Sequence, residues 1–345
     1  MKRKITLMGL FIMILFGLMA LYSINRPKVQ LVMVNATPIN KVKITAVGDC
    51  TIGWDDRYDP DGRYDYYLKQ NNNDYGYYFA KVKTLFSLDD LTIANLEGTF
   101  TDYDEKVEKK FNFKAPAEYA KVLTLGNIDV VSIANNHSHD YGEIGYKDTK
   151  KTLEENNISY YGYTNYLIKE VNGIKIGFFG LLDIYGERYS EVDKAIKFLK
   201  ENECDLIIAS MHWGIEYDYE QSKEQVKMGH YLIDNGVDLV IGHHPHIIQG
   251  IEKYHDRYIL YSLGNFSFGG NSLPRDMDTY IWQQTFTFKD GVLELDDNIN
   301  IIPAYVSSIK KPNNYQPIVL EDDRKESVMK KIMKYSSGFE YNTEN

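Results

Sequence analysis

Short apolar runs that end in polar residues recur along most of the chain. Six of them, rich in Ile, Val, Leu and Ala, span residues 42–47, 91–94, 128–134, 174–180, 205–210 and 237–241. Such runs are typical of strands buried on both faces of a sheet. Helical patterns lie between several of them, at residues 117–125, 145–156, 191–202 and 222–235. This alternation predicts an α/β domain.

The pattern changes after Tyr254. The segments 257–263, 280–288 and 292–304 are typical of strand pairs, with a turn at 289–291 between the last two. We expect this part to add antiparallel strands. A polar loop, a helical pattern at 324–335 and a polar tail then follow. We therefore predict a main domain at 42–310 and a partly disordered C-terminal extension at 311–345.

An uncharged apolar run precedes the domain. Residues 5–24 carry no charged side chain and follow three basic residues. Such a run spans a bilayer as a helix, and its basic flank stays in the cytoplasm. We predict a cytoplasmic start at 1–4, a transmembrane anchor at 5–24, a tether at 25–41 and an extracytoplasmic domain on the cell membrane. A cleaved signal peptide remains the alternative, although residues 21–25 lack a small-x-small cleavage site.

The overall charge limits the choice of partner. The chain has 39 Lys and Arg against 49 Asp and Glu, which gives a net charge of -10. A broad basic surface for nucleic acid is therefore not expected, so we predict no nucleic-acid partner.

Polar side chains follow the ends of the apolar runs. Ligands gather beyond the carboxyl ends of strands in α/β sheets, so these side chains are the first candidates for a site. A single Asp after a strand is commonly a turn former or a helix cap. Here, however, six of the eight histidines lie in three strand-end clusters beside carboxylates and carboxamides. Histidine with carboxylate and carboxamide is the ligand mixture that divalent metal ions prefer, so the clusters are candidates for a metal site.

These clusters also carry a family resemblance. The motifs are Gly48-Asp49, Asn95-Leu96-Glu97, Ala134-Asn135-Asn136-His137 with Asp140-Tyr141-Gly142, His212-Trp213-Gly214 with Glu216, Gly242-His243-His244-Pro245-His246 and Ser262-Leu263-Gly264-Asn265-Phe266. In this order, across residues 43–268, they resemble the signatures of the CapA family of poly-γ-glutamate capsule proteins. That family is similar to calcineurin-like metallophosphatases. The resemblance implies a two-sheet β-sandwich flanked by helices (αββα).

The resemblance also implies metal ligands. Asp49 and His246 would hold one divalent ion, and Asn136, His212 and His244 would hold the second. Glu97 stands where the phosphoesterases have an aspartate that bridges both ions. We expect two ions, with Mn, Zn and Fe as the candidates. Thr51 replaces a histidine that often serves as a further ligand, which weakens the first site.

A two-metal site of this kind would support phosphoester hydrolysis. Paired divalent ions lower the pKa of a shared water and stabilise charge in an in-line displacement. His137 would protonate the leaving oxygen or steady the phosphoryl group, and Asp140 would orient its ring, unless Asp140 is a helix cap. Asn95, Glu216 and Asn265 are candidates for contacts to the substrate or to the metal ligands.

We predict a metal-dependent protein of poly-γ-glutamate capsule or related surface-polymer biosynthesis or export, with phosphoesterase-type chemistry. The expected partners are the membrane, polyglutamate or a phosphorylated surface polymer, and other membrane proteins of capsule synthesis. Two alternatives stay open. One is a non-catalytic accessory that grips the polymer, which the departure at Thr51 favours, and the other is an extracellular phosphoesterase unrelated to capsule.

Overall fold

A computed structural model describes residues 39–295 and 297–341 of this protein. The predicted basic start, the anchor at 5–24 and most of the tether lie outside these residues. None of the helices within the described ranges is both long enough and apolar enough to cross a membrane.

The larger sheet combines strands from both ends of the chain. Its order is β17-β16-β14-β1-β2-β5-β6, with β13 beside β1 and β15 beside β14. The run from β1 to β6 is parallel, whereas β14, β16 and β17 pair antiparallel. The strands are β1 (Ile39–Thr51), β2 (Leu91–Leu96), β5 (Val130–Ser132), β6 (Ser159–Tyr161), β13 (Asn265–Phe268), β14 (Asp278–Lys289), β15 (Val292–Leu293), β16 (Ile299–Tyr305) and β17 (Ile318–Val319).

The second sheet has the order β11-β12-β10-β9-β8-β7. Its four inner strands run parallel, and both edge strands are antiparallel to their neighbours. The strands are β7 (Leu167–Val171), β8 (Ile174–Leu182), β9 (Leu206–His212), β10 (Leu239–His243), β11 (Ile251–Tyr254) and β12 (Arg257–Leu260). A small separate ribbon joins β3 (Thr99–Phe100) to β4 (Lys114–Ala115).

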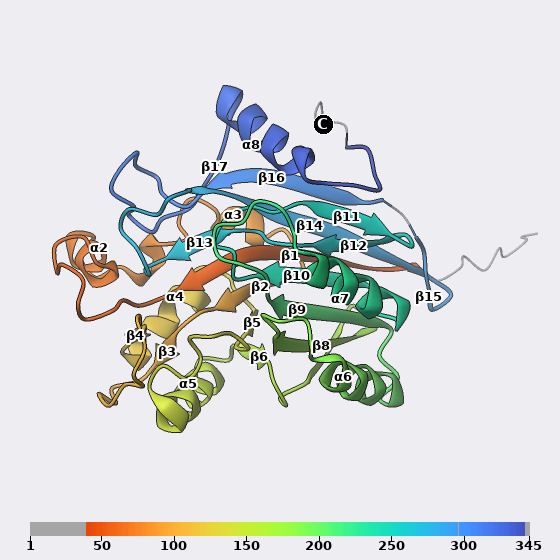
Figure 1. The fold of residues 1–345 in the computed structure, drawn as a ribbon, viewed down its shortest axis with the longest axis horizontal. Helices are drawn as coiled ribbons and strands as arrows, with labels where there is room; N and C mark the ends of the chain where they lie inside the picture. The colour runs from red at the N-terminus through yellow and green to blue at the C-terminus, as the bar shows by residue number, and fades with distance from the viewer. Residues whose placement is uncertain (1–38, 296, 342–345) are drawn as a thin grey trace, which may run out of the picture. The chain divides into compact units, whose positions relative to one another are not determined.

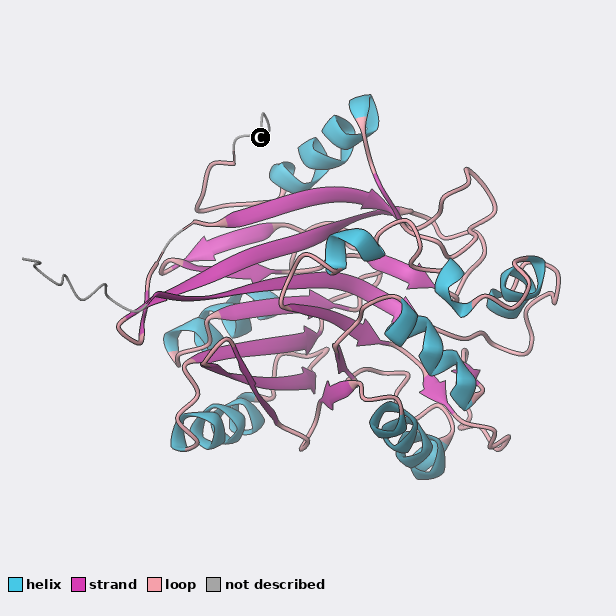
Figure 2. Ribbon diagram, turned by 180° about the vertical axis from the view of Figure 1, so that it is seen from behind, coloured by secondary structure: helices cyan, strands magenta, loops and turns pink. Residues whose placement is uncertain are grey.

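The two sheets pack face to face around one apolar core, and helices cover the outer faces (Figure 1; Figure 2). Ile44 and Ile93 of the larger sheet share the central core with Ile176 and Ile208 of the smaller sheet. The helices and 3-10 turns are α2 (Tyr64–Gln70), η1 (Tyr75–Tyr77), α3 (Lys83–Phe86), η2 (Ala117–Tyr119), α4 (Ala120–Leu125), α5 (Gly142–Glu155), α6 (Tyr189–Glu201), α7 (Lys223–Asp234) and α8 (Asp322–Lys334).

Each outer face has its own cluster of buried side chains. On the larger sheet, residues of α2 to α5 pack against Ala94 and Val131. On the smaller sheet, α6 and α7 pack against Ile207 and Val240. Successive residues of one strand therefore pack alternately into the central core and into the cluster on the outer face. Because both faces are buried, these strands are continuous apolar runs in the sequence. The prediction of a mixed α/β domain with more than one sheet is confirmed.

The strand expected at 292–304 is divided into β15 and β16. Between them, Asp297 accepts a hydrogen bond from the Tyr258 hydroxyl at 2.9 Å and pairs with Lys253 at 2.7 Å. These polar contacts join Asp297 to β11 and β12 of the neighbouring sheet.

Residues beyond the predicted boundary at 310 also complete the fold. β17 extends the larger sheet, and α8 adds Val328 and Ile332 to the central core. Tyr315 is buried among the helices of the larger sheet's outer face. At the other end, β1 begins at Ile39, inside the predicted tether.

Candidate metal centre

Two glycines let the carboxyl ends of strands approach other backbone closely. A Cβ on Gly48 would lie 2.0 Å from the Gly264 carbonyl oxygen, and one on Gly242 would lie 2.1 Å from the Tyr261 carbonyl oxygen. Only glycine fits at such distances. The close approach allows the Asp49 N–H to donate to the Gly264 carbonyl at 2.9 Å, which fixes the backbone that carries this carboxylate.

Strand register then brings candidate side chains together in pairs. Asp49 lies opposite Asn95 on β2 and opposite Asn265 on β13. In the second sheet, His212 at the end of β9 lies opposite His243 at the end of β10. The sequence places these residues at strand ends, and the parallel register places the ends side by side.

Asp49 lies at the centre of the site and is completely buried. Its Oδ1 accepts a hydrogen bond from Asn95 Nδ2 at 2.9 Å and lies 3.1 Å from His243 Nδ1. Its Oδ2 accepts the His244 N–H at 3.2 Å and lies 3.5 Å from His246 Nδ1. Burial raises the pKa of Asp49, but contact with His243 and the other histidines outweighs burial and lowers this pKa below its usual range.

Glu97 is a second completely buried carboxylate. Its Oε1 lies 3.6 Å from His212 Nε2, and its Oε2 lies 3.9 Å from His246 Nδ1. Oε1 has no hydrogen-bond partner among the described residues. Burial, and next the charge of Asp49, raise the pKa of Glu97 well above its ordinary value. Two buried carboxylates with an unsatisfied oxygen are the environment that a cation stabilises.

His212 and His244 form the other side of the site. His212 Nε2 lies 2.7 Å from Asn136 Oδ1 and 3.1 Å from His244 Nδ1. Burial, and next the neighbouring His244, lower the pKa of His212 well below its ordinary value. Burial, and next His246, lower the pKa of His244 to about 4. Both rings are therefore neutral at pH 7, and the neutral imidazole is the form that binds metal.

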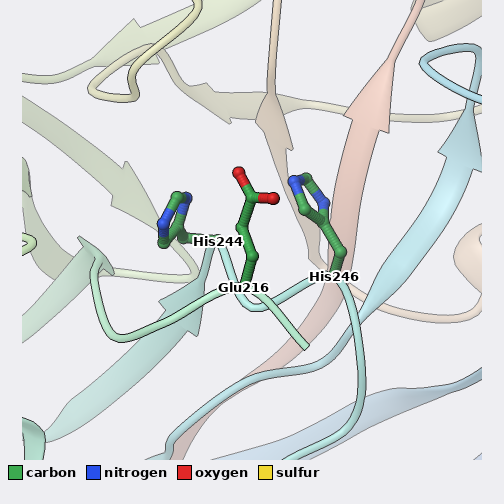
Figure 3. A group of neighbouring side chains, drawn as sticks. All are labelled: Glu216, His244 and His246. Carbon is green, nitrogen blue, oxygen red and sulfur yellow. The ribbon is translucent and has the colours of Figure 1, made fainter. Parts of the chain in front are cut away.

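His246 joins two groups of ligand atoms. Its nitrogens belong to one group with Asp49 and Glu97 and to another with His244 and Glu216, and within each group the ligand atoms lie within 4.8 Å of one another. Figure 3 shows the second group, in which only Glu216 is exposed. His246 Nδ1 also lies 2.9 Å from Asn265 Oδ1.

The segment that carries two of these histidines is strained. His244 has φ 98° and His246 has φ 59°, which are left-handed values that non-glycine residues rarely adopt. Strained backbone of this kind is concentrated at functional sites, where the surrounding contacts hold it in place.

His137 and Asp140 form a buried pair beside this group. His137 Nδ1 lies 2.7 Å from Asp140 Oδ2, which also accepts the Phe113 N–H at 2.6 Å. Burial lowers the pKa of His137, with Asp140 acting in the opposite direction. Asp140 is not a helix cap, because α5 begins at Gly142 with Tyr141 as its N-cap residue and without a side-chain cap hydrogen bond.

The structure therefore brings together all of the sequence-predicted site residues: Asp49, Asn95, Glu97, Asn136, His137, Asp140, His212, Glu216, His244, His246 and Asn265. The donor set of carboxylate, carboxamide and imidazole fits divalent metal ions. Thr51 contributes in another way, since its hydroxyl lies 3.5 Å from Glu97 Oε2 as a hydrogen-bond donor.

Sequence reasoning gave no role to three residues that support the site. His243 contacts Asp49, although its place at the end of a strand was visible in the sequence. Asn135 donates to Asn95 Oδ1 at 3.1 Å and accepts the His137 N–H at 3.0 Å. Lys109 reaches His137 from a polar segment that carries no strand-end signal.

Comparison with known families decides the relationship. A family profile described as "Bacterial capsule synthesis protein PGA_cap" matches residues 43–270. The chain belongs to this family. The matched range contains every predicted site residue of this PGA_cap member.

Two relatives have names that describe a process. The chain is 30% identical over 258 residues to "Capsule biosynthesis protein CapA" of Bacillus anthracis, which covers 66% of this chain and 60% of the relative. It is 28% identical over 273 residues to "PGA biosynthesis protein CapA" of Bacillus subtilis (strain 168), covering 72% and 71%. This PGA_cap member thus spans about 60% of the length of the first relative.

A solved structure of a hypothetical protein from Thermus thermophilus superposes with a TM-score of 0.47 and 16% identity, covering 76% of this chain and 98% of that one. The PGA_cap assignment does not depend on this superposition.

Proposed function

We propose that this PGA_cap member is a membrane-anchored, metal-dependent protein that acts in the synthesis or export of poly-γ-glutamate or a related surface polymer, with phosphoesterase-type chemistry. Family membership and the names of two relatives support the link to capsule polymer. The apolar run at 5–24 after a basic start supports the anchor.

One observation carries the metal-dependent part of the proposal. Glu97 is completely buried, and its two oxygens face different histidines, with Oε1 near His212 and Oε2 near His246. A carboxylate between two sets of imidazoles is suited to bridge two cations. Asp49 and His246 would then hold one ion, while Asn136, His212 and His244 would hold the other.

Bound divalent ions would lower the pKa of a water and polarise a phosphoryl oxygen. The protein's own contribution is the His137–Asp140 pair. The Nδ1–H of a neutral His137 donates to Asp140, so Nε2 is the nitrogen left to exchange a proton with a substrate oxygen. Asn136 is the neighbour of His137 in the chain, which couples the position of this ring to a proposed metal ligand.

A second candidate function is that of a non-catalytic accessory protein, which would use the metal site to hold polymer. Thr51 favours this second function. A histidine at this position would add a metal ligand, whereas the Thr51 hydroxyl only donates a hydrogen bond to Glu97 at 3.5 Å. The chain has a net charge of -10, so an anionic polymer would be repelled by its bulk field and held through metal.

The full chain in detergent would test both functions. We expect the purified protein to contain a divalent metal and to hydrolyse at least one phosphoester in a panel, with loss of activity after chelation. Chelator-sensitive binding of polyglutamate without turnover of any phosphoester would support the accessory instead. Three results together would contradict the metal-dependent proposal. The purified protein would contain no divalent metal, it would not bind added Mn, Zn or Fe, and it would bind polymer equally well with and without a chelator.

A further inference from the structure

A segment between β3 and β4 folds across the turn that carries His137 and Asp140. We refer to residues 107–113 as the strap. The Val107 N–H and the Asn112 Nδ2 both donate to the Asp140 carbonyl, at 2.9 and 3.2 Å. The Phe113 N–H donates to the Asp140 carboxylate at 2.6 Å. The strap is thus tied to both the backbone and the side chain of this one aspartate.

Lys109 of the strap is directed into this turn. Its Nζ forms an ion pair with Asp140 Oδ1, donates to the Asn136 carbonyl at 2.7 Å and lies 3.2 Å from His137 Nδ1. The side chain is 28% exposed, whereas that of Asp140 is completely buried. Because the ammonium is already engaged by two protein oxygens, it is better suited to hold the turn than to bind substrate.

These contacts assign the proton on the His137 ring. Nδ1 cannot donate to Asp140 and also accept from Lys109. The contact to Asp140 is shorter, at 2.7 Å against 3.2 Å, and Asp140 already has an ammonium and a backbone N–H as donors. The carboxylate therefore acts as the acceptor, and the proton lies on Nδ1.

The strap also restricts the ring itself. The Phe113 ring lies 4.4 Å from the His137 ring, centroid to centroid, at an interplanar angle of 38°. Phe111 stacks on Phe113 at 6.3 Å, so the aromatic side chains of the strap support one another. Packing against Phe113 and the hydrogen bond to Asp140 together limit rotation of the imidazole.

We propose that Lys109 is a positioning residue that holds Asp140 and the Asn136 carbonyl, so that His137 keeps its proton on Nδ1 and presents Nε2 to the reacting group. This inference rests on the proposed role of His137. Without Lys109, Asp140 would lose its ion-pair partner, and the turn between Asn136 and Asp140 would lose its link to the strap.

Three variants of the full chain test the proposal: Lys109→Met, Lys109→Arg and, as a matched control, Lys106→Met. Lys106 belongs to the same polar segment and is exposed, so its replacement removes the same charge without these contacts. In Lys109→Met we expect kcat on the best phosphoester to fall about 10- to 100-fold, the usual effect of removing an orienting partner, with KM within about twofold of the parent. Lys109→Arg should restore part of the loss, and Lys106→Met should match the parent.

Imidazole ¹⁵N NMR separates this inference from the proposed function, because it requires no turnover. The parent should show His137 as the Nδ1–H tautomer, identified by the signal missing from His137→Gln. Lys109→Met should shift this signal toward the other tautomer or broaden it. An unchanged signal in a cooperatively folded Lys109→Met would overturn the proposal, and so would a rise in KM alone. If Lys109→Met does not fold, Lys109→Gln takes its place with the same expectations.

Discussion

Replacement of Glu97 by glutamine should reduce stabilisation by metal without destabilising the metal-free fold. Burial and the charge of Asp49 raise the pKa of Glu97 well above 4.5. A carboxyl whose pKa is raised in the folded state stabilises the fold below its unfolded pKa and loses that contribution as pH rises through the folded pKa. In chelated protein near neutral pH, Glu97→Gln should therefore be at least as stable as the parent.

In the presence of metal, Glu97→Gln should instead be less stable than the parent. A ligand at 100 times its Kd stabilises a fold by about 2.7 kcal/mol. Unfolding entropy of about 2.1 cal/mol/K per residue gives about 0.6 kcal/mol/K for a unit of about 300 residues. Metal should accordingly raise the parent's Tm by about 4 °C. Glu97→Gln should lose most of this rise, because a neutral amide replaces a charged ligand shared by two sets of histidines.

Differential scanning calorimetry of the full chain, chelated and then supplied with Mn²⁺ or Zn²⁺, measures both effects. Glu155→Gln is the control, because this side chain is 62% exposed and pairs with Lys151 at 3.7 Å. The control should show the same metal-dependent rise as the parent. A parent whose Tm does not respond to metal, or a Glu97→Gln variant that keeps the full rise, would refute the reasoning.

Three further predictions follow from the same geometry. His137→Ala should keep its metal content while turnover falls about 10²- to 10⁴-fold, whereas His212→Ala should lose metal and turnover together, as measured by metal analysis and phosphoester assay. Gly242→Ala should destabilise the protein by about 1–3 kcal/mol in urea unfolding, because its Cβ would meet the Tyr261 carbonyl oxygen at 2.1 Å. A chain that starts at residue 39 should melt cooperatively, since β1 begins there, and a molten product would contradict this boundary.

The sequence was sufficient to predict the central strands because each is buried on both faces and is therefore apolar throughout. The candidate site residues could also be selected from the sequence, since Asp49, His212 and the His244 segment each follow such a strand directly, and the structure brings them together. Edge strands such as β7 and β11 were not predicted. β7 is only partly buried, so its apolar pattern is weaker.

Contacts between residues far apart in the chain could not be predicted from the sequence. Lys109 lies in a polar segment that resembles any solvated loop, and its importance depends on how that loop folds over Asp140. The role of His243 was hidden for a related reason. Its contact with Asp49 joins the two sheets, and no local pattern specifies how two sheets pack.

The amides of the site differ from two of its ionisable groups in how their hydrogen bonds are satisfied. Asn95, Asn135 and Asn265 show how this chain satisfies buried amides at the same strand ends, because each makes hydrogen bonds to neighbouring side chains. Within the described part of the chain, Glu97 Oε1 and His243 Nε2 are among the buried atoms without such a partner, as are atoms of Tyr280, Trp282 and Gln284 on β14. Unsatisfied buried groups are costly, and a bound cation would compensate a buried carboxylate oxygen and a buried imidazole nitrogen. Unsatisfied Glu97 Oε1 and His243 Nε2 beside well-bonded asparagines are what the proposed metal dependence requires, and the response of Glu97→Gln to metal tests it.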